Sequence, residues 1–304
     1  MSGTTMVALF GDQNVIPALH VAIASMLASW AGPDPLEIQL FHCGIPAADV
    51  ELMAKTAAMA GRPSVFRDAA LDVSRVRHWT SFYGSHVPYG RIFLPRLLPE
   101  RDEVIYLDAD VIVDLDVRKL VTKRRDGDLL AALPNWDFAH SHDARLAADM
   151  GVPGDTSYFQ SGVLVFDLAE WRKDDTLTRC LEIGDRYHDR LRSHDQTVLN
   201  LACRGRISDI PREWTTYLYP TRSGHTSYPE ESIRNFCGAP KPFDPLGNLL
   251  NYHFELFNQW LSRTALAGWS PNNFRQLSQL KRNVRLIKPL LSTVSRMLLK
   301  KIRP

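Results

Sequence analysis

The apolar run from Val104 to Leu107 ends abruptly in Asp108, Ala109 and Asp110, and this junction constrains the fold more than any other feature. A short, uninterrupted apolar run is typical of a strand that is buried on both faces. A second apolar run, from Val111 to Val113, follows the acidic pair. Carboxylates between apolar segments need a charged partner, because an unpaired buried charge is costly. We therefore expect an α/β protein with an acidic site at the end of a central strand.

Strand-like and helix-like segments alternate through much of the chain, and this alternation predicts a parallel sheet with helices on both faces. Ligands in open α/β sheets bind beyond the carboxyl ends of strands, where Asp12 and the acidic pair both fall. The expected strands are Met6 to Phe10, Leu36 to Cys43, Ser64 to Asp68, Leu129 to Leu133 and Gly162 to Phe166, and the expected helices are Ile16 to Ala28, Ala47 to Ala60 and Asp174 to Arg190.

Size and composition fit one α/β domain with an extension. The chain has 304 residues, 45% of them apolar and 23% charged, which excludes a disordered or fibrous protein. Its four cysteines contain no C-x-x-C pair, so neither a zinc site nor a disulfide framework is expected, and a reducing cytoplasm fits best. The apolar stretch from Val15 to Trp30 follows a strand without a basic leader and is too short to span a bilayer, which indicates a buried helix.

Charge is distributed unevenly along the chain. Residues 256–304 contain ten Lys or Arg and no Asp or Glu, whereas residues 1–255 carry 26 basic and 34 acidic side chains. Within this basic segment, Ile287, Leu291, Val294 and Leu298 follow Val284 at helical spacing. A basic amphipathic helix predicts contact with an anionic membrane surface, although packing at a dimer interface is an alternative. Nucleic acid is not expected, because the segment lacks interleaved aromatic residues.

The acidic pair itself predicts a metal site. Carboxylates at i and i+2 after a strand can turn toward one Mg²⁺ or Mn²⁺, with nucleotide phosphates completing the coordination shell. Phosphatases of the haloacid dehalogenase type also place D-x-D after a central strand, where Asp108 would be a nucleophile. That motif normally belongs to an early strand, whereas about a hundred residues precede it here. The phosphatase alternative is therefore weaker.

Six segments together resemble the family 8 retaining glycosyltransferases, which include bacterial lipopolysaccharide galactosyl- and glucosyltransferases. Their order and approximate spacing match from about residue 5 to 245. The resemblance implies a GT-A type, Rossmann-like mixed sheet with helices on both faces in residues 1–255, followed by a basic helical tail in 256–304. The matching segments are Asp12 with Asn14, Arg91 in YGRIFLPRLL, EVIYLDADVIVDLDV, YFQSGVLVFDLAEWR, Asp195 with Gln196 in HDQTVLN, and IRNFCGAPKPF.

This resemblance implies roles for the residues of a donor site that binds a UDP-sugar. Asp12 and Asn14 match contacts to the base and ribose, and Asp12 would also suit a helix cap. Arg91 matches a basic residue near the diphosphate, although a structural ion pair is nearly as plausible. The implied metal ligands for Mn²⁺ or Mg²⁺ are Asp108 and Asp110, with Ala109 between them in the donor site.

The remaining implied roles belong to two motifs, the G-x-x-K-P element at residues 238–242 and the D-Q pair formed by Asp195 and Gln196. Gly238 lets the backbone approach the phosphates, and Lys241 neutralises the leaving group. Gln196 would stabilise the anomeric carbon through its amide oxygen, while Asp195 would bind sugar hydroxyls or, more simply, begin a helix. Since an amide is a poor nucleophile, front-side attack is favoured over double displacement. Gln160 and Ser161 occupy positions that line the sugar pocket.

Two departures from the family pattern affect these expectations. Asn235 stands where the family usually has a metal-binding histidine, and an amide oxygen binds a hard cation more weakly. Val15 replaces a tyrosine that commonly packs on the base.

The expected reaction is transfer of galactose or glucose from a UDP-sugar to an oligosaccharide or glycolipid acceptor, at the cytoplasmic face of the membrane. A non-catalytic sugar-nucleotide-binding module is the alternative that Asn235 favours.

Overall fold

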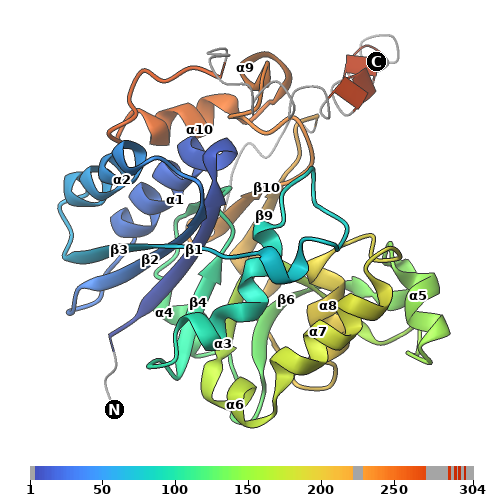
Figure 1. Ribbon diagram of the computed structural model, residues 1–304. Helices are drawn as coiled ribbons and strands as arrows, with labels where there is room; N and C mark the ends of the chain where they lie inside the picture. Colours follow the sequence, from blue (N-terminus) through green and yellow to red (C-terminus); the bar gives the residue numbers. More distant parts are fainter. Residues whose placement is uncertain are drawn as a thin grey trace.

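The computed structural model describes residues 4–221 and 229–271, together with residues 287–288, 291–292, 294–295 and 298. Its centre is a seven-stranded sheet with the order β3-β2-β1-β4-β7-β6-β8 (Figure 1). A three-stranded sheet has the order β5-β10-β9. The strands of the large sheet are β1 (Met6–Asp12), β2 (Leu36–Cys43), β3 (Ser64–Ala70), β4 (Glu103–Leu107), β6 (Leu130–Asp137), β7 (Ser157–Asp167) and β8 (Ile207–Asp209).

The large sheet is mixed, which confirms what the family resemblance implied, whereas the parallel sheet predicted from the alternation of strands and helices holds only for part of it. Strands β1, β2, β3 and β4 are parallel, whereas β7 runs antiparallel to both β4 and β6. These two reversals give β6 the direction of β1 and β4. The carboxyl ends of β1, β4 and β6 therefore share one edge of the sheet with the amino end of β7, which is the edge where α/β proteins bind ligands.

Helices cover both faces of the large sheet because alternate strand residues point to opposite sides. On one face, Leu9 and Ile105 pack against apolar residues of α1 (Ile16–Ala28) and α2 (Ala47–Met59). Helix α1 is buried along most of its length, which explains its continuous apolar sequence and confirms the buried-helix prediction.

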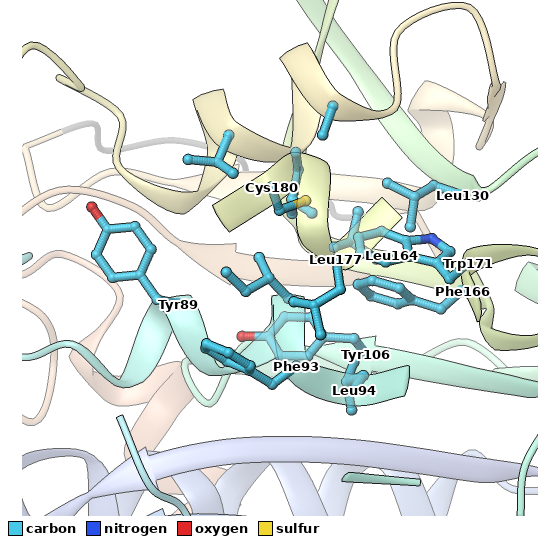
Figure 2. Close-up of a cluster of buried hydrophobic side chains, with 14 of the residues drawn as sticks. Tyr89, Phe93, Leu94, Tyr106, Leu130, Leu164, Phe166, Trp171, Leu177 and Cys180 are labelled. Atoms are coloured by element: carbon cyan, nitrogen blue, oxygen red, sulfur yellow. The ribbon is translucent and has the colours of Figure 1, made fainter. Parts of the chain in front are cut away.

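The opposite face is covered by α3 (Leu94–Leu97), α6 (Leu168–Lys173), α7 (Thr176–Tyr187) and α8 (Asp195–Ala202). Figure 2 shows the cluster on this face, where Tyr106 of β4 and Phe166 of β7 lie among Leu94, Trp171 and Leu177. The aromatic rings fill the space between the sheet and the helices, and their burial is a main source of the stability of this layer.

The small sheet brings a distant part of the chain to the acidic pair. It consists of β5 (Val111–Val113), β9 (Thr215–Leu218) and β10 (Ile233–Phe236). Strand β10 is antiparallel to β5, with Asn235 opposite Val111, and the backbone N–H of Phe236 donates to the carbonyl of Asp110. This pairing explains how residues more than a hundred positions apart form one site.

The beginning of the basic segment packs onto the α/β core. Helix α10 (Phe254–Leu261) buries Phe257 and Leu261 in a cluster with Ala18 and Val21 of α1. Farther along, the described tail residues are helical, and Ile287, Leu291 and Leu298 are exposed. The rest of the predicted tail helix lies outside the described residues. None of the helices in the described part of the chain combines the length and apolar character needed to cross a bilayer.

Candidate active site

Asp12 ends β1, and both of its carboxylate oxygens accept hydrogen bonds. Oδ1 accepts from the backbone N–H and the side-chain amide of Asn14, both at 2.9 Å. This contact caps the short 3₁₀ helix that follows the strand, as expected for a helix cap. Oδ2 accepts from the hydroxyl of Ser85 at 2.9 Å, which joins the 82–86 turn to the end of β1. Sequence reasoning missed Ser85, because a serine in a loop gives no signal of its own.

Asp108 lies directly after β4 and is held on one side by internal donors. Its Oδ1 accepts from the Tyr106 hydroxyl at 2.6 Å and from Nη2 of Arg91 at 3.0 Å. Its backbone N–H donates to the carbonyl of Gly162 at 2.8 Å. Burial raises the pKa of Asp108; the charge of Arg91 opposes this, and the charge of Asp110 adds to it.

Arg91 is buried between the carboxylates of Asp108 and Asp195. It is 4% exposed, and it forms ion pairs with Asp108 at 3.0 Å and with Asp195 at 3.1 Å. Its Nη1 donates to the carbonyl of Ser161, and its guanidinium lies 4.2 Å from the centre of the Tyr106 ring. Burial alone would lower the pKa of Arg91, but the charge of Asp195 and other neighbouring groups raise it. Arg91 therefore lies in the interior beneath the site and holds Asp108 and Asp195 in place.

The D-Q pair begins α8, as its helix-forming sequence suggests. Asp195 is 5% exposed, and its buried Oδ2 forms the 3.1 Å ion pair with Nε of Arg91 but accepts no hydrogen bond among the described residues. Burial raises its pKa to about 6, against the attraction of Arg91 and with a further increase from Asp108. Gln196 directs its amide oxygen toward the backbone N–H of Ser161, at 3.3 Å. A buried carboxylate oxygen that accepts no hydrogen bond can accept one from a hydroxyl group of a ligand.

Lys241 lies against the second aspartate of the pair. Its Nζ is 2.7 Å from Oδ2 of Asp110 and donates to the carbonyl of Phe236. Burial lowers the pKa of Lys241, but the charge and hydrogen bond of Asp110 together with the neighbouring Cys237 and Asp244 more than offset this, so the pKa is raised and the side chain stays protonated. Gly238 has a φ of +72°, a left-handed conformation that favours glycine. The loop thus turns tightly enough to return Lys241 to the acidic pair.

Asn235 and Asp108 face each other across Gly162. A Cβ atom added to Gly162 would lie 2.6 Å from Nδ2 of Asn235 and 2.8 Å from Oδ2 of Asp108. Only glycine leaves room for both side chains at this position of β7. A glycine inside a strand signals a close approach, and this signal could have identified Gly162, which sequence reasoning missed. The structure thus brings all the predicted residues from Asp108 to Lys241 to one edge, with Gln160 and Ser161 just before Gly162.

The donor set fits a divalent cation only if the ligand contributes oxygens. Among the described residues, no group of three or more His, Cys, Asp or Glu is arranged to hold a metal ion. The available ligands are the carboxylates of Asp108 and Asp110 and the amide of Asn235. Hard oxygen ligands of this kind suit Mn²⁺ or Mg²⁺ when phosphate oxygens complete the shell. The residues therefore fit a metal bound together with a nucleoside diphosphate.

The mixed sheet with an acidic pair after β4 defines the class of GT-A glycosyltransferases. The model of the family described as Glycosyl transferase family 8 matches residues 6–243, and the chain belongs to this family. The phosphatase alternative rested on the pair Asp108 and Asp110, and membership of the glycosyltransferase family explains this pair without it.

Individual relatives agree with this assignment. General stress protein A of Bacillus subtilis (strain 168) is 25% identical over 252 residues, which cover 77% of this chain and 85% of the relative. Lipopolysaccharide 1,2-glucosyltransferase of Escherichia coli (strain K12) is 28% identical over 170 residues, which cover 52% of this chain and 49% of the relative. The match thus spans about half the length of the second relative.

Two solved structures share the fold. The galactosyltransferase LgtC, in complex with donor and acceptor sugar analogs, has a TM-score of 0.70 and 21% identity, covering 89% of this chain and 99% of its own. The WbbM bifunctional glycosyltransferase has a TM-score of 0.72 and 17% identity, covering 93% of this chain and 52% of its own. At these identities the similarity concerns the fold.

Proposed function

We propose that this glycosyltransferase moves galactose or glucose from a UDP-sugar to an oligosaccharide or glycolipid acceptor of the lipopolysaccharide type, with retention of configuration. The observation that carries the proposal is the position of Arg91, which forms an ion pair with Oδ2 of the buried Asp195 at 3.1 Å. Arg91 also holds Asp108, so the sugar-binding and phosphate-binding groups are joined through one side chain. The names of the lipopolysaccharide glucosyltransferase and of the galactosyltransferase LgtC favour hexose donors.

The donor would lie along the edge from β1 to β4. Asp12 and Asn14 offer an acceptor and a donor for the base and ribose, while Lys241 offers its cation to the diphosphate. Asp108, Asp110 and Asn235 would hold Mn²⁺ or Mg²⁺ against the phosphates. The metal ion supplies positive charge that stabilises the departing UDP.

Retention would proceed by front-side attack. Double displacement needs a carboxylate nucleophile, and the carboxylate in question, Asp195, is buried and engaged by Arg91. Gln196 presents an amide oxygen, which is a weak nucleophile but can stabilise positive character at the anomeric carbon. Asp195 would accept a hydrogen bond from a hydroxyl of the transferred sugar and so fix its orientation.

The acceptor would bind beside the carboxyl end of β6, at the same edge of the sheet. Nδ2 of Asn135 is buried without a hydrogen-bond partner among the described residues, and the neighbouring Trp136 is 48% exposed. Register shifts in the β6–β7 pairing on either side of Leu133 and Pro134 redirect these side chains. An amide donor next to an exposed aromatic ring suits a saccharide, which has polar edges and an apolar face.

The basic tail would hold the enzyme at the cytoplasmic face of the membrane, near lipid-linked acceptors. Residues 256–304 carry ten basic and no acidic side chains. The exposed Ile287, Leu291 and Leu298 would enter the interface between headgroups and acyl chains.

A donor panel tests the proposed function. The protein is incubated with a series of nucleotide sugars and Mn²⁺, with and without lipopolysaccharide-derived acceptors, and release of UDP and of inorganic phosphate is measured. UDP release with UDP-galactose or UDP-glucose is expected. A non-catalytic binding module is the second candidate, favoured by Asn235, and it predicts UDP binding without turnover of any donor.

A further inference from the structure

The two oxygens of the Asp108 carboxylate have different surroundings. Oδ1 accepts from the Tyr106 hydroxyl and from Arg91. No hydrogen bond among the described residues reaches Oδ2, which faces Gly162 and the amide of Asn235. One oxygen is therefore fixed by the protein interior, while the other is directed toward the site.

Tyr106 is placed where it can act on the site through Asp108 and Arg91. It lies two residues before Asp108, at the end of β4, is 2% exposed, and its hydroxyl forms one hydrogen bond among the described residues, to Oδ1 of Asp108. The guanidinium of Arg91 lies 4.2 Å from the centre of its ring, so Tyr106 also limits how Arg91 can move. The side chain emerges from an apolar strand into the cluster of Figure 2 and does not reach the ligand edge itself.

We propose that Tyr106 is a positioning residue, which together with Arg91 fixes Oδ1 of Asp108 so that Oδ2 is presented to the divalent cation. Two donors on one oxygen determine the plane of the carboxylate, whereas a single donor leaves it free to rotate. The inference rests on the proposed metal-dependent binding of UDP. It assigns a role to a residue that would touch neither the metal nor the donor.

Tyr106→Phe removes the hydroxyl and keeps the ring. The affinity for UDP is measured by calorimetry in EDTA and in MnCl₂, and binding of Mn²⁺ in the presence of UDP is followed by electron paramagnetic resonance. The variant is expected to bind UDP about tenfold more weakly in Mn²⁺, as for loss of a hydrogen bond to a charged group, and equally well in EDTA. Mn²⁺ binding should weaken in parallel.

Tyr89→Phe is the matched control. Tyr89 is also fully buried, but its hydroxyl donates to the carbonyl of Thr80 at 3.0 Å. The control should retain wild-type affinity in Mn²⁺, and thermal unfolding of the two variants shows whether they differ in stability. Equal loss of UDP affinity in EDTA and in Mn²⁺ would overturn the positioning role, because it would indicate a structural defect.

The two levels of the proposal can fail separately. If the wild type responds to Mn²⁺ and Tyr106→Phe responds equally, the role of Tyr106 is wrong while the metal-dependent function stands. If UDP affinity of the wild type is indifferent to Mn²⁺, the metal site is wrong and the role of Tyr106 fails with it.

Discussion

The ammonium group of Lys241 lies 2.7 Å from a carboxylate oxygen of Asp110. The residue proposed to neutralise the leaving group thus lies beside a proposed metal ligand, and both would contact the same diphosphate. Lys241→Ala should lower kcat on the order of 100-fold, because it removes a charge that stabilises the departing UDP. Steady-state donor turnover measures this. Lys119→Ala, which removes an exposed lysine paired with Glu231, is the control, and equal kcat values for the two variants would contradict the role of Lys241.

Gly162→Ala should abolish the effect of Mn²⁺ on UDP affinity. The added methyl group would collide with Oδ2 of Asp108 and Nδ2 of Asn235, at 2.8 and 2.6 Å. Calorimetry of UDP binding with and without Mn²⁺ measures the effect. Gly154→Ala, whose nearest contact would be Ala139 at 3.2 Å, should retain it. If Gly162→Ala still responds to Mn²⁺ as the wild type does, the metal site lies elsewhere.

The pKa of Asp195 predicts a pH-dependent contribution to stability. Its folded-state value of about 6 exceeds the 3.8 of an ordinary aspartate, so the stabilisation is complete below pH 3.8 and is lost as the pH rises through about 6. Between pH 4 and 7, the free energy of unfolding of the wild type should fall relative to Asp195→Asn, by on the order of 3 kcal/mol. Denaturant unfolding without metal or ligand provides the measurement.

The control for this pH dependence is Asp174→Asn. A hydrogen bond from Arg179 lowers the pKa of Asp174, so its stabilising effect is lost only below the same pH window. The difference between wild type and Asp174→Asn should stay nearly constant from pH 4 to 7. A constant difference for Asp195→Asn as well would show that Asp195 titrates normally.

Trp136→Ala should raise the KM for the acceptor about tenfold, because it removes the exposed ring beside Asn135. The affinity for UDP should not change, since the proposed UDP-binding groups lie at the ends of β1 and β4 and not on β6. Initial rates at varied acceptor concentration test this, with Met59→Ala as a control at an exposed apolar residue of α2. An unchanged acceptor KM would exclude the carboxyl end of β6 as the acceptor site.

Deletion of residues 281–304 should leave turnover of soluble acceptors intact and reduce binding to anionic vesicles. The deleted segment carries eight of the ten basic residues of the tail. Because charge attraction is screened by ions, binding of the full chain to the vesicles should weaken as the salt concentration rises. Co-sedimentation with phosphatidylglycerol vesicles measures the binding. Vesicle binding that is unaffected by the deletion would contradict the membrane role.

The elements of the fold could be predicted from the sequence where the order of apolar and polar residues distinguishes a strand from a helix. The buried run before Asp108 predicted a central strand, and the alternation up to Ala60 predicted the parallel strands and their helices. A mixed sheet was expected from the family resemblance, but the local pattern could not give the direction of β7, because a buried apolar strand has the same pattern in a parallel or antiparallel ladder. Strand β6 also extends beyond Leu133, through Pro134 to Asp137, which a proline would not suggest.

The candidate site was predictable only as a set of polar residues. The sequence indicated that Asp108, Asp195 and Arg91 carry function, but it could not show that Arg91 lies between the two carboxylates. Such contacts depend on the packing of η3 (Val87–Phe93) and α8 against the sheet, and thus on long-range structure. The role of Tyr106 could not be predicted, because a tyrosine within an apolar run is usually buried for packing alone.

The antiparallel direction of β7 places part of the candidate site on a central strand, so the surrounding loops can vary in sequence without moving it. Its amino end delivers Gln160 to Gly162 to the ligand edge, where Gln160 pairs with Leu133 of β6 and the carbonyl of Gly162 accepts from the backbone N–H of Asp108. The proposed sugar pocket is therefore attached to both neighbouring strands in the middle of the sheet. Surface loops around it can lengthen or diversify during evolution, altering which molecules are accepted while the chemistry itself stays in place.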